Sequence, residues 1–379
     1  MSSSLLDQLL AKRTQLTPTV TVVRPHPCIC AGTKAFGMSA LGGRIEAERE
    51  EAEEDTIAAA RAVAKKLRAS RSAVVYTGAG ISTATGISDY RGPKGVWTSL
   101  ARGVIPDEAF DITSARPSFT HMALKKLVDE GLVKFIVSTN LDGLHYKSGM
   151  TPLDNLAEMH GSMWYERCAR CHKDSPARPF PVRRGGDPNK SHPRATGRWC
   201  SCGGMYMDSG IDFGQTLPWR HLAAAEAAAE QSDFSLVVGT SMRVAPASTL
   251  PFVLGGAKSK HGNDNANKTS AVASSSDHAS ATKENVTIVN LMDTPFDDRA
   301  ALRSFAKADT FFFHLMQELE LRCPTPPEVL HLHTATQMKA LAKRFLPDHG
   351  RNYVGKAQRE QEMASALFAV EEEMLARES

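Results

Sequence analysis

A glycine-punctuated loop that follows an apolar run has the composition of a nucleotide-binding turn. The run SAVVY at 72–76 predicts a buried strand, and Gly78 and Gly80 come directly after it. Glycines at this place let backbone amides approach a diphosphate, because no side chain stands in the way. Thr83 stands where the dinucleotide fingerprint has its third glycine, so the motif alone is a weak signal of nucleotide binding.

The same loop continues with charged and aromatic side chains. Asp89, Tyr90 and Arg91 occupy the region where a typical dehydrogenase carries the acid that holds a ribose. We expect this polar, glycine-rich stretch to move and to contact a charged ligand.

A second polar segment, STNLDGLH at 138–145, follows another predicted strand. Ligands of open α/β sheets bind beyond the carboxyl ends of the strands, which is where Asn140 and Asp142 are expected. An amide and a carboxylate together match a carboxamide, because that group offers both an acceptor and donors. A loop cap or a turn is the alternative role for these two side chains.

His160, followed by Gly161, is the candidate general base. An unperturbed imidazole titrates near ~6.5, and a neighbouring glycine would let a substrate approach it. Most single histidines lie on the surface or are satisfied structurally, and residue type alone makes His145 a second candidate.

Four cysteines form two tight pairs, Cys168 with Cys171 and Cys200 with Cys202. Four thiolates close a tetrahedral zinc site without an open position for water, so the predicted metal is structural. His172 and His192 are reserve ligands if the four cysteines are not the complete set.

Composition excludes several classes of protein. Of 379 residues, 42% are apolar and 23% charged, which is the balance of a globular protein. The formal net charge of +3 is too small to hold the protein on nucleic acid by bulk charge. We expect no membrane association, because no apolar run reaches the ~18 residues of a transmembrane helix.

Short apolar runs alternate with helical patterns along the chain. After 72–76, runs at 134–138, 235–239 and 286–290 predict further buried strands, and helices are expected at 46–69, 118–130 and 220–231. This alternation predicts an α/β fold, namely a Rossmann-like parallel sheet with a smaller inserted zinc-binding domain.

The expected domain organisation follows from shifts in composition. A flexible arm covers 1–45, and the Rossmann-like domain consists of 46–161 and 211–320 with a disordered insert at 256–285. Residues 162–210 form the zinc-binding domain, and 321–379 form a helical tail. Met363, Leu367, Val370 and Met374 make one apolar stripe on that tail, which would pack on its own domain or on a partner helix.

Taken together and in this order, the motifs resemble the sirtuin family of NAD-dependent protein deacylases. The resemblance covers roughly residues 50–320. The matching segments are GAGIS with DYRG, STNLDGLH, HG, the cysteine pairs, IDFGQ at 211–215, GTS at 239–241 and VNL at 289–291. Three of the longer runs are similar to the nuclear, class IV branch: DYRGPKGVW, TSARPSFTHMAL and VNLMDTPFDD.

The resemblance implies a set of site residues on a Rossmann-like NAD lobe and a cleft shared with the zinc lobe. His160 would be the base, and Asn140 and Asp142 would serve the nicotinamide pocket as further catalytic residues. The other NAD-contacting residues would be Gly78, Ala79, Gly80, Ser82, Asp89, Tyr90, Arg91, Trp97, Thr139, Leu141, Gly239, Thr240, Ser241, Asn290, Leu291 and Ala308. The extended substrate would pair with Ile211, Asp212, Phe213 and Gly214 as an added strand.

The implied activity is NAD-dependent deacylation of protein lysines. The acyl oxygen would attack the ribose carbon as nicotinamide leaves, His160 would remove a proton from a ribose hydroxyl, and O-acyl-ADP-ribose would be released. Mono-ADP-ribosylation of proteins at the same site, or a chromatin scaffold that binds NAD or ADP-ribose with little catalysis, are the alternatives.

The resemblance also implies acyl-lysine proteins, histones among them, as partners, and association with chromatin. It places the protein in the nucleus, with the mitochondrion or the cytoplasm as alternatives. The chain departs from the family pattern at Thr139, where a glutamine is usual, at Ser88, where a proline is usual, and at Gln215, where many members have glutamate.

Overall fold

The structure is a computed structural model that describes residues 47–104, 112–175, 181–182, 192, 194–212, 214–255, 284–325, 338–339, 342–343 and 356–378. The predicted arm at 1–45 and most of the predicted insert at 256–285 therefore lie outside the described residues. The last two residues of that insert, Glu284 and Asn285, open a strand instead, since Glu284 pairs with Ala300 of the neighbouring strand.

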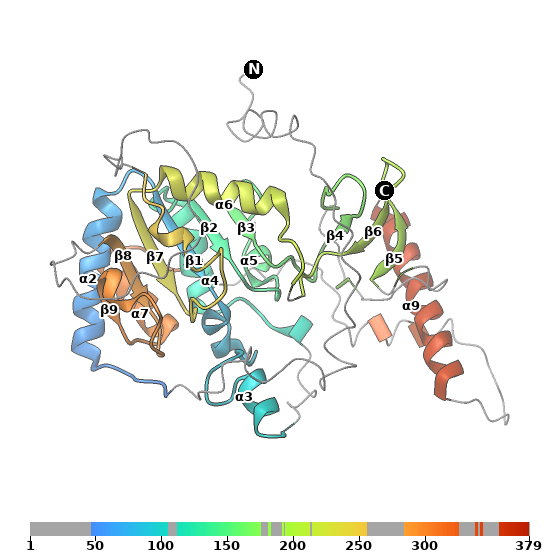
Figure 1. The fold of residues 1–379 in the computed structure, drawn as a ribbon, viewed down its shortest axis with the longest axis horizontal. Coiled ribbons are helices and arrows are strands. Elements are labelled where there is room, and N and C mark those ends of the chain that lie inside the picture. The colour runs from blue at the N-terminus through green and yellow to red at the C-terminus, as the bar shows by residue number, and fades with distance from the viewer. Residues whose placement is uncertain are drawn as a thin grey trace, which may run out of the picture. The chain divides into compact units, whose positions relative to one another are not determined.

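A six-stranded parallel sheet is the core of the protein (Figure 1). Its strand order is β3-β2-β1-β7-β8-β9. The strands are β1 Ala73–Thr77, β2 Phe135–Ser138, β3 Leu156–Glu158, β7 Phe234–Val238, β8 Glu284–Val289 and β9 Ala300–Ser304. The four predicted strands are confirmed, whereas the two edge strands, β3 and β9, were not predicted.

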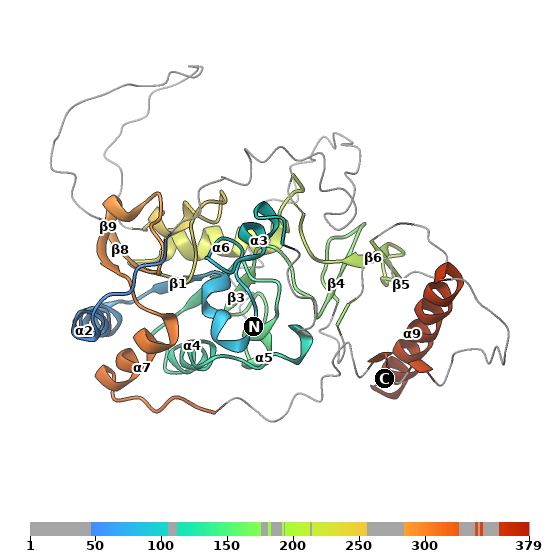
Figure 2. The same cartoon turned by 90° about the horizontal axis from the view of Figure 1, so that it is seen from below.

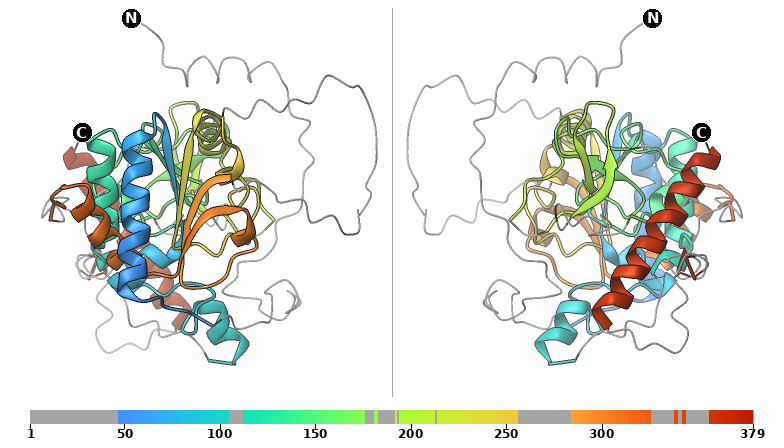
Figure 3. Two further views of the ribbon diagram at one scale, coloured as in Figure 1. Left: turned by 90° about the vertical axis from the view of Figure 1, so that its left-hand side faces the viewer. Right: turned by 90° about the vertical axis from the view of Figure 1, so that its right-hand side faces the viewer.

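Helices cover both faces of this sheet (Figures 2 and 3). Successive side chains of β1 point to opposite faces of the sheet, so the core has two parts. Ala73 and Val75 pack with α2 Glu53–Ala69, α4 Phe119–Asp129 and α7 Ala308–Glu318. Val74 and Tyr76 point to the other face and pack with α6 Trp219–Gln231. Two shorter helices, α3 Val96–Ala101 and α5 Leu144–Lys147, complete this part of the chain.

The predicted helices at 118–130 and 220–231 are confirmed, but the first helix begins later than its composition predicts. Residues 47–52 are not helical, and α2 begins at Glu53. The Glu51 carboxylate accepts hydrogen bonds from Thr56 Oγ1, from Ser304 Oγ and from the Phe305 amide. These bonds hold the chain against the end of β9, so the first acidic residues cannot join the helix.

One row of residues crosses the sheet where its strands end. Glu158 is opposite Ser138, Ser138 is opposite Thr77, and Thr77 is opposite Val238 of β7. Val238 is in turn opposite Val289. The loops that follow these strands therefore begin at one level, on the side of the sheet where open α/β folds bind ligands.

A second, three-stranded antiparallel sheet carries the cysteine pairs. Its order is β4-β6-β5, with β4 Glu166–Cys168, β5 Ala195–Trp199 and β6 Met205–Asp208. Cys168 ends β4, and Cys200 directly follows β5. The strands thus bring the two pairs of cysteines to the same end of the small sheet.

The tail contains one long helix, α9 Lys356–Glu378, which confirms the predicted late helix. Its apolar stripe packs on Met338 and Ala342 of this chain. A buried ion pair also fixes it, because Glu371 accepts a hydrogen bond of 3.0 Å from Arg198 of β5. Arg198 lies 3.5 Å from the buried carboxylate of Glu166 as well, so the helix is tied to the small sheet.

Within the described residues, no helix combines the length and the apolar composition that crossing a membrane requires.

Replacing Glu371 by glutamine should loosen α9 without unfolding the rest of the protein. The arginine would lose a charged partner in a buried place, which costs about 1–3 kcal/mol of docking free energy. Hydrogen exchange measured by mass spectrometry should show the α9 amides exchanging roughly 10-fold faster, with the amides of β1 and β7 unchanged.

Glu362→Gln is the matched control on the same helix, since its carboxylate bonds to Gln358 within α9. Equal exchange of α9 in the wild type and in Glu371→Gln would show that the ion pair does not hold the helix.

Candidate active site and zinc centre

His160 lies on a tight turn that follows the edge strand β3. The Gly161 amide donates to the Glu158 carbonyl at 3.2 Å, which closes a four-residue turn with His160 at its third position. Gly161 has φ +84°, and a Cβ on it would stand 2.0 Å from the Ser209 carbonyl oxygen. Only glycine fits there, so the pair HG reflects the geometry of the turn itself.

Hydrogen bonds hold this turn on both sides. The Met159 amide donates to the Ser138 carbonyl of β2 at 2.8 Å, and the His160 carbonyl accepts from the Ile211 amide at 2.9 Å. Ser209 Oγ accepts from the Ser162 amide at 3.0 Å and donates to the Ser162 carbonyl at 2.7 Å. The backbone that carries the imidazole is therefore fixed before any ligand binds.

The environment of His160 favours its neutral form. Its side chain is half-buried, and this burial lowers the pKa of the imidazole, while the neighbouring Thr139 backbone acts in the opposite direction. A neutral imidazole can accept a proton at neutral pH, as a general base must.

Ser82 joins two of the predicted ligand-binding loops. Its buried Oγ donates to Asp142 Oδ2 at 2.7 Å and accepts from Asn140 Nδ2 at 3.2 Å. Asp142 Oδ1 also accepts from the Leu144 amide at 2.9 Å, and Asn140 Nδ2 donates to the Gly78 carbonyl at 3.2 Å. Within the described part of the chain no hydrogen bond to Asn140 Oδ1 is found.

Gly78 and Gly80 make room for the protein backbone. A Cβ on Gly78 would stand 2.6 Å from Thr240 Cβ, and one on Gly80 would stand 2.8 Å from Gly239 Cα. The Gly78 amide donates to the Val238 carbonyl and the Gly80 amide to the Gly239 carbonyl, at 3.2 and 2.8 Å. These two amides are used inside the protein, which differs from the expectation that they approach a diphosphate.

The loop at 88–97 is linked to the segment after β7. Arg91 stacks on the Trp97 ring at 4.4 Å, and its Nη1 lies 3.5 Å from Ser241 Oγ. Tyr90 and Trp97 have ring centroids 4.9 Å apart. Asp89 accepts from the Gly92 amide at 3.1 Å, and burial raises the pKa of this carboxyl. A guanidinium and a serine hydroxyl held together in this way fit an anionic group such as a diphosphate.

The remaining predicted cofactor residues follow the same row of strand ends. Thr139 bonds back to the Thr77 carbonyl through both its amide and its hydroxyl, at 3.1 and 3.2 Å. Asn290 follows β8, and its Nδ2 donates to the Met292 carbonyl at 2.9 Å. Leu141, Thr240 and Leu291 are half-buried beside these residues in sequence, and Ala308 is the first residue of α7.

The predicted substrate-binding segment is described only in part. The Ile211 amide reaches the His160 carbonyl, and Phe213 lies outside the described residues. Asp212 and Gln215 form a turn of their own, in which the Asp212 carbonyl accepts from the Gln215 amide at 3.1 Å. Gly214, with φ +81°, lies in this turn.

His145, the second candidate for the base, is a core residue. It is 2% exposed, its Nε2 lies 2.9 Å from Thr77 Oγ1, and its ring contacts the buried ring of His121 edge-on at 4.8 Å. Burial lowers the pKa of each of these two imidazoles to about 3.

Sequence reasoning missed a buried carboxyl two residues before His160. Glu158, 1% exposed, ends β3, and burial raises the pKa of its carboxyl to about 8, with the Tyr165 and Ser162 side chains opposing the shift. Its position two residues before His160 was the only available signal.

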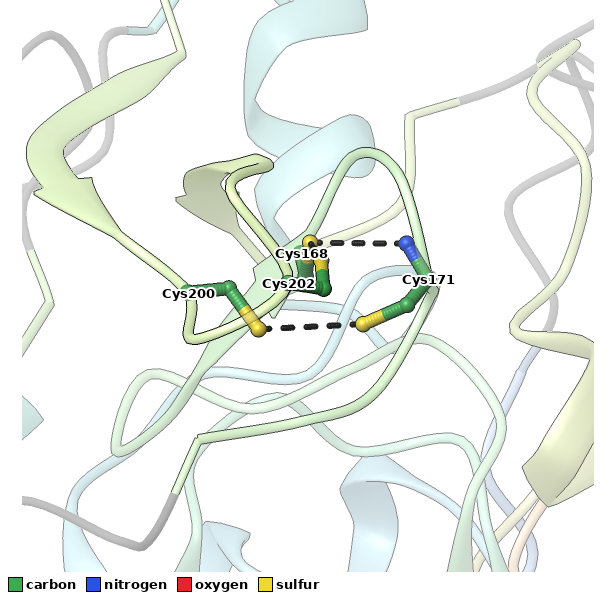
Figure 4. Close-up of side chains that lie close together, drawn as sticks. All are labelled: Cys168, Cys171, Cys200 and Cys202. Carbon is green, nitrogen blue, oxygen red and sulfur yellow. Dashed lines mark hydrogen bonds between the residues drawn. The ribbon is translucent and has the colours of Figure 1, made fainter.

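The four cysteines converge on one point (Figure 4). All four Sγ atoms lie within 4.8 Å of one another, with Cys168 to Cys202 at 3.5 Å and Cys171 to Cys200 at 3.7 Å. Sulfurs around a tetrahedral zinc ion, each at ~2.3 Å, stand about 3.8 Å apart, so the set fits Zn²⁺. Within the described residues neither His172 nor His192 belongs to this cluster.

The arrangement places the His160 turn, the Asn140 side chain and the contact between Arg91 and Ser241 on the side of the sheet where its strands end. Four thiolates fill a tetrahedral zinc site completely, so that metal would stabilise the small sheet and activate no water.

Comparison with known proteins identifies relatives of this chain. Residues 107–246 match the model of the Sir2 family. The chain is 37% identical over 272 residues to NAD-dependent protein deacetylase sirtuin-7 of Mus musculus. These residues are 70% of this chain and 60% of the mouse protein. It is 34% identical over 268 residues to NAD-dependent protein deacetylase SRT1 of Arabidopsis thaliana, covering 69% of this chain and 49% of the plant protein.

A third relative is matched over more of its own length. NAD-dependent protein deacetylase Sirt6 of Drosophila melanogaster is 35% identical over 225 residues, which are 57% of this chain and 70% of the fly protein. The chain thus spans about half to two thirds of the length of these relatives. With this identity, this coverage and the parallel sheet that carries His160 at its edge, the chain belongs to the Sir2 family.

Proposed function

We propose that this protein is an NAD-dependent protein-lysine deacylase that releases nicotinamide and O-acyl-ADP-ribose. The observation that carries the proposal is the position of His160, half-buried on a hydrogen-bonded turn that begins level with the Asn140 loop. Three relatives bear the name NAD-dependent protein deacetylase, which supports the same activity.

The loops at the strand ends would hold NAD. Asn140 Oδ1 would accept a hydrogen bond from the carboxamide of nicotinamide, and the Ser82 hydroxyl would keep the Asn140 and Asp142 side chains in place. Arg91 and Ser241 would face the diphosphate, with Ala79 between the two internally bonded glycines. NAD itself supplies a ribose carbon whose bond to nicotinamide can be broken.

His160 would act once nicotinamide has left. The acyl oxygen of the substrate would form a bond to the ribose carbon as the bond to nicotinamide breaks. The neutral imidazole would then remove a proton from a ribose hydroxyl, so that this oxygen could attack the acyl carbon. Addition of water would release the lysine amine and leave the acyl group on the ribose oxygen. Holding the imidazole on a fixed turn reduces the entropy lost in reaching this geometry.

We also propose that the two sheets belong to two domains with different roles. Residues 46–161 and 211–320 would form the NAD-binding domain, and 162–210 the zinc-binding domain. Cys168, Cys171, Cys200 and Cys202 would hold one structural Zn²⁺, which would link the ends of β4 and β5 on either side of β6.

Acyl-lysine proteins would be the substrates, and histones are the favoured ones. The protein would act on chromatin in the nucleus, because the chain is similar to sirtuin-7. Residues 211–214 would pair with the extended substrate backbone. A partner helix on the tail stays a prediction, since the described contacts of the α9 stripe are with this chain.

Replacing His160 by glutamine should remove acyl-dependent turnover. Glutamine keeps a polar side chain on the turn but cannot accept the proton, so turnover should fall about 100- to 10,000-fold. The measurement is formation of acyl-ADP-ribose from labelled NAD and an acetyl-lysine peptide, followed by mass spectrometry.

His314→Gln on α7 is the matched control. The His314 imidazole pairs with Glu53 of α2 at 3.2 Å and takes no part in the site. Wild-type turnover in His160→Gln would remove the base from the mechanism. Label that stays on protein in the wild type would favour mono-ADP-ribosylation over deacylation.

The acid limb of kcat/KM should lie below pH 6.5. Burial lowers the pKa of His160, so the imidazole stays neutral and active at a lower pH than an exposed histidine. The rate should be constant above this limb and fall as the pH drops through the lowered pKa. A pH series with the acetyl-lysine peptide measures the midpoint, and a midpoint at or above 6.5 would contradict the assignment.

A further inference from the structure

The strand that leads to His160 is at the edge of the sheet. Among the described strands β3 pairs with β2 alone, and its first residue, Leu156, also forms an isolated bridge with Pro152. Since the Met159 amide points to β2, the Glu158 amide points away from the sheet. A buried backbone donor without a partner costs about 1–3 kcal/mol, so this edge needs an acceptor from elsewhere.

That acceptor is a histidine of α6. His221 Nδ1 lies 3.0 Å from the Glu158 amide nitrogen, in a buried place. Accepting at Nδ1 requires the proton to sit on Nε2, and His221 Nε2 lies 2.8 Å from Asp174 Oδ2. Both ring nitrogens are therefore used, and the carboxylate selects the tautomer that can accept from β3.

Asp174 is itself held by the small sheet. Arg167 of β4 donates to Asp174 Oδ1 at 2.7 Å, and the two side chains are 11% and 15% exposed. The Asp174 backbone forms a bridge with Arg167 as well. Neighbouring charge and the His221 hydrogen bond together outweigh burial and lower the pKa of the Asp174 carboxyl.

The surroundings show that this histidine is more than core filling. His221 is 0% exposed in a helix whose other buried residues are alanines, and its ring stacks on Tyr165 with planes 4° apart. Alanine at this position would leave the Glu158 amide without a partner. The Glu158 carboxyl and the Tyr165 hydroxyl lie in the same buried region, next to the turn that carries His160.

We propose that His221, oriented by Asp174, is a positioning residue for His160. A series of hydrogen bonds fixes Glu158, the first residue of the catalytic turn, from the side that β2 cannot reach. The series runs from Arg167 through Asp174 and His221 to the Glu158 amide. It also ties that turn to β4, the strand that ends in Cys168. This inference rests on the proposed function, because it concerns the base of that reaction.

Two substitutions separate positioning from folding. His221→Asn keeps an acceptor close to the place of Nδ1, whereas His221→Leu fills the space without one. His314→Asn is the matched control, since it removes a histidine from another helix that also faces a carboxylate. Zinc content and thermal unfolding are measured for every variant.

The kinetic test uses the two halves of the reaction. Exchange of labelled nicotinamide into NAD, with acetyl-lysine peptide present, reports the first bond exchange, which does not need the base. Acyl-ADP-ribose formation reports the step that does. In His221→Leu the second rate should fall about 10- to 100-fold while exchange stays within about 2-fold of the wild type, and His221→Asn should recover most of the loss.

Two kinetic results would overturn the proposal. One is acyl-ADP-ribose formation in His221→Leu within 2-fold of the wild type, and the other is an equal fall of both rates, which would make His221 merely structural.

Hydrogen exchange at residues 158–161 tests the anchor independently of activity. These amides should exchange at least 10-fold faster in His221→Leu, with protection retained in His221→Asn and His314→Asn. If the wild type neither exchanges nicotinamide nor deacylates, the proposed function fails, and this measurement still decides the anchor. Unchanged protection in His221→Leu would refute it.

Discussion

The close approach of two backbone segments at the middle of the sheet determines the rest of the site. β1 pairs with both β2 and β7, so the chain after Thr77 meets the chain after Val238 at the point where the strand order turns. Gly80 and Gly239 touch there with their amide and carbonyl groups, and no Cβ fits between them. This contact directs Ser82 toward Asn140 and Asp142, and it leaves Ser241 within reach of Arg91.

The sequence indicated the interior of the sheet well because interior strands are buried on both faces. Residues 73–77 and 234–238 are wholly buried, and they stand out as continuous apolar runs. β3 has only three residues, and β9 contains Arg303 and Ser304, so neither edge strand shows such a run. Local pattern cannot identify strands whose stability comes from a single neighbour.

The candidate site was predictable where residue type reveals the chemistry. The four cysteines belong to this class, since the structure brings them together, whereas the role of His160 stays a prediction. Gly78 and Gly80 led to the expectation of a diphosphate beside them, whereas the structure places the backbone of Gly239 and Thr240 there. A glycine shows that a Cβ is absent, but it does not show which group occupies the space. His221 had no signal, since it is one histidine in an alanine-rich helix and bonds to a residue 63 positions away. Contacts of that separation depend on the assembled fold.

β4 links the two sheets because successive side chains of a strand point to opposite sides. Arg167 points to Asp174, and through His221 it supports the turn that carries His160. Glu166 and Cys168 point the other way, where Glu166 shares Arg198 with the tail helix and Cys168 joins the thiolate cluster. A metal that fixes the end of this strand therefore also limits the movement of Arg167. A closed zinc centre with no catalytic position can in this way contribute to the geometry of the turn that carries His160, through hydrogen bonds and without any chemistry at the metal.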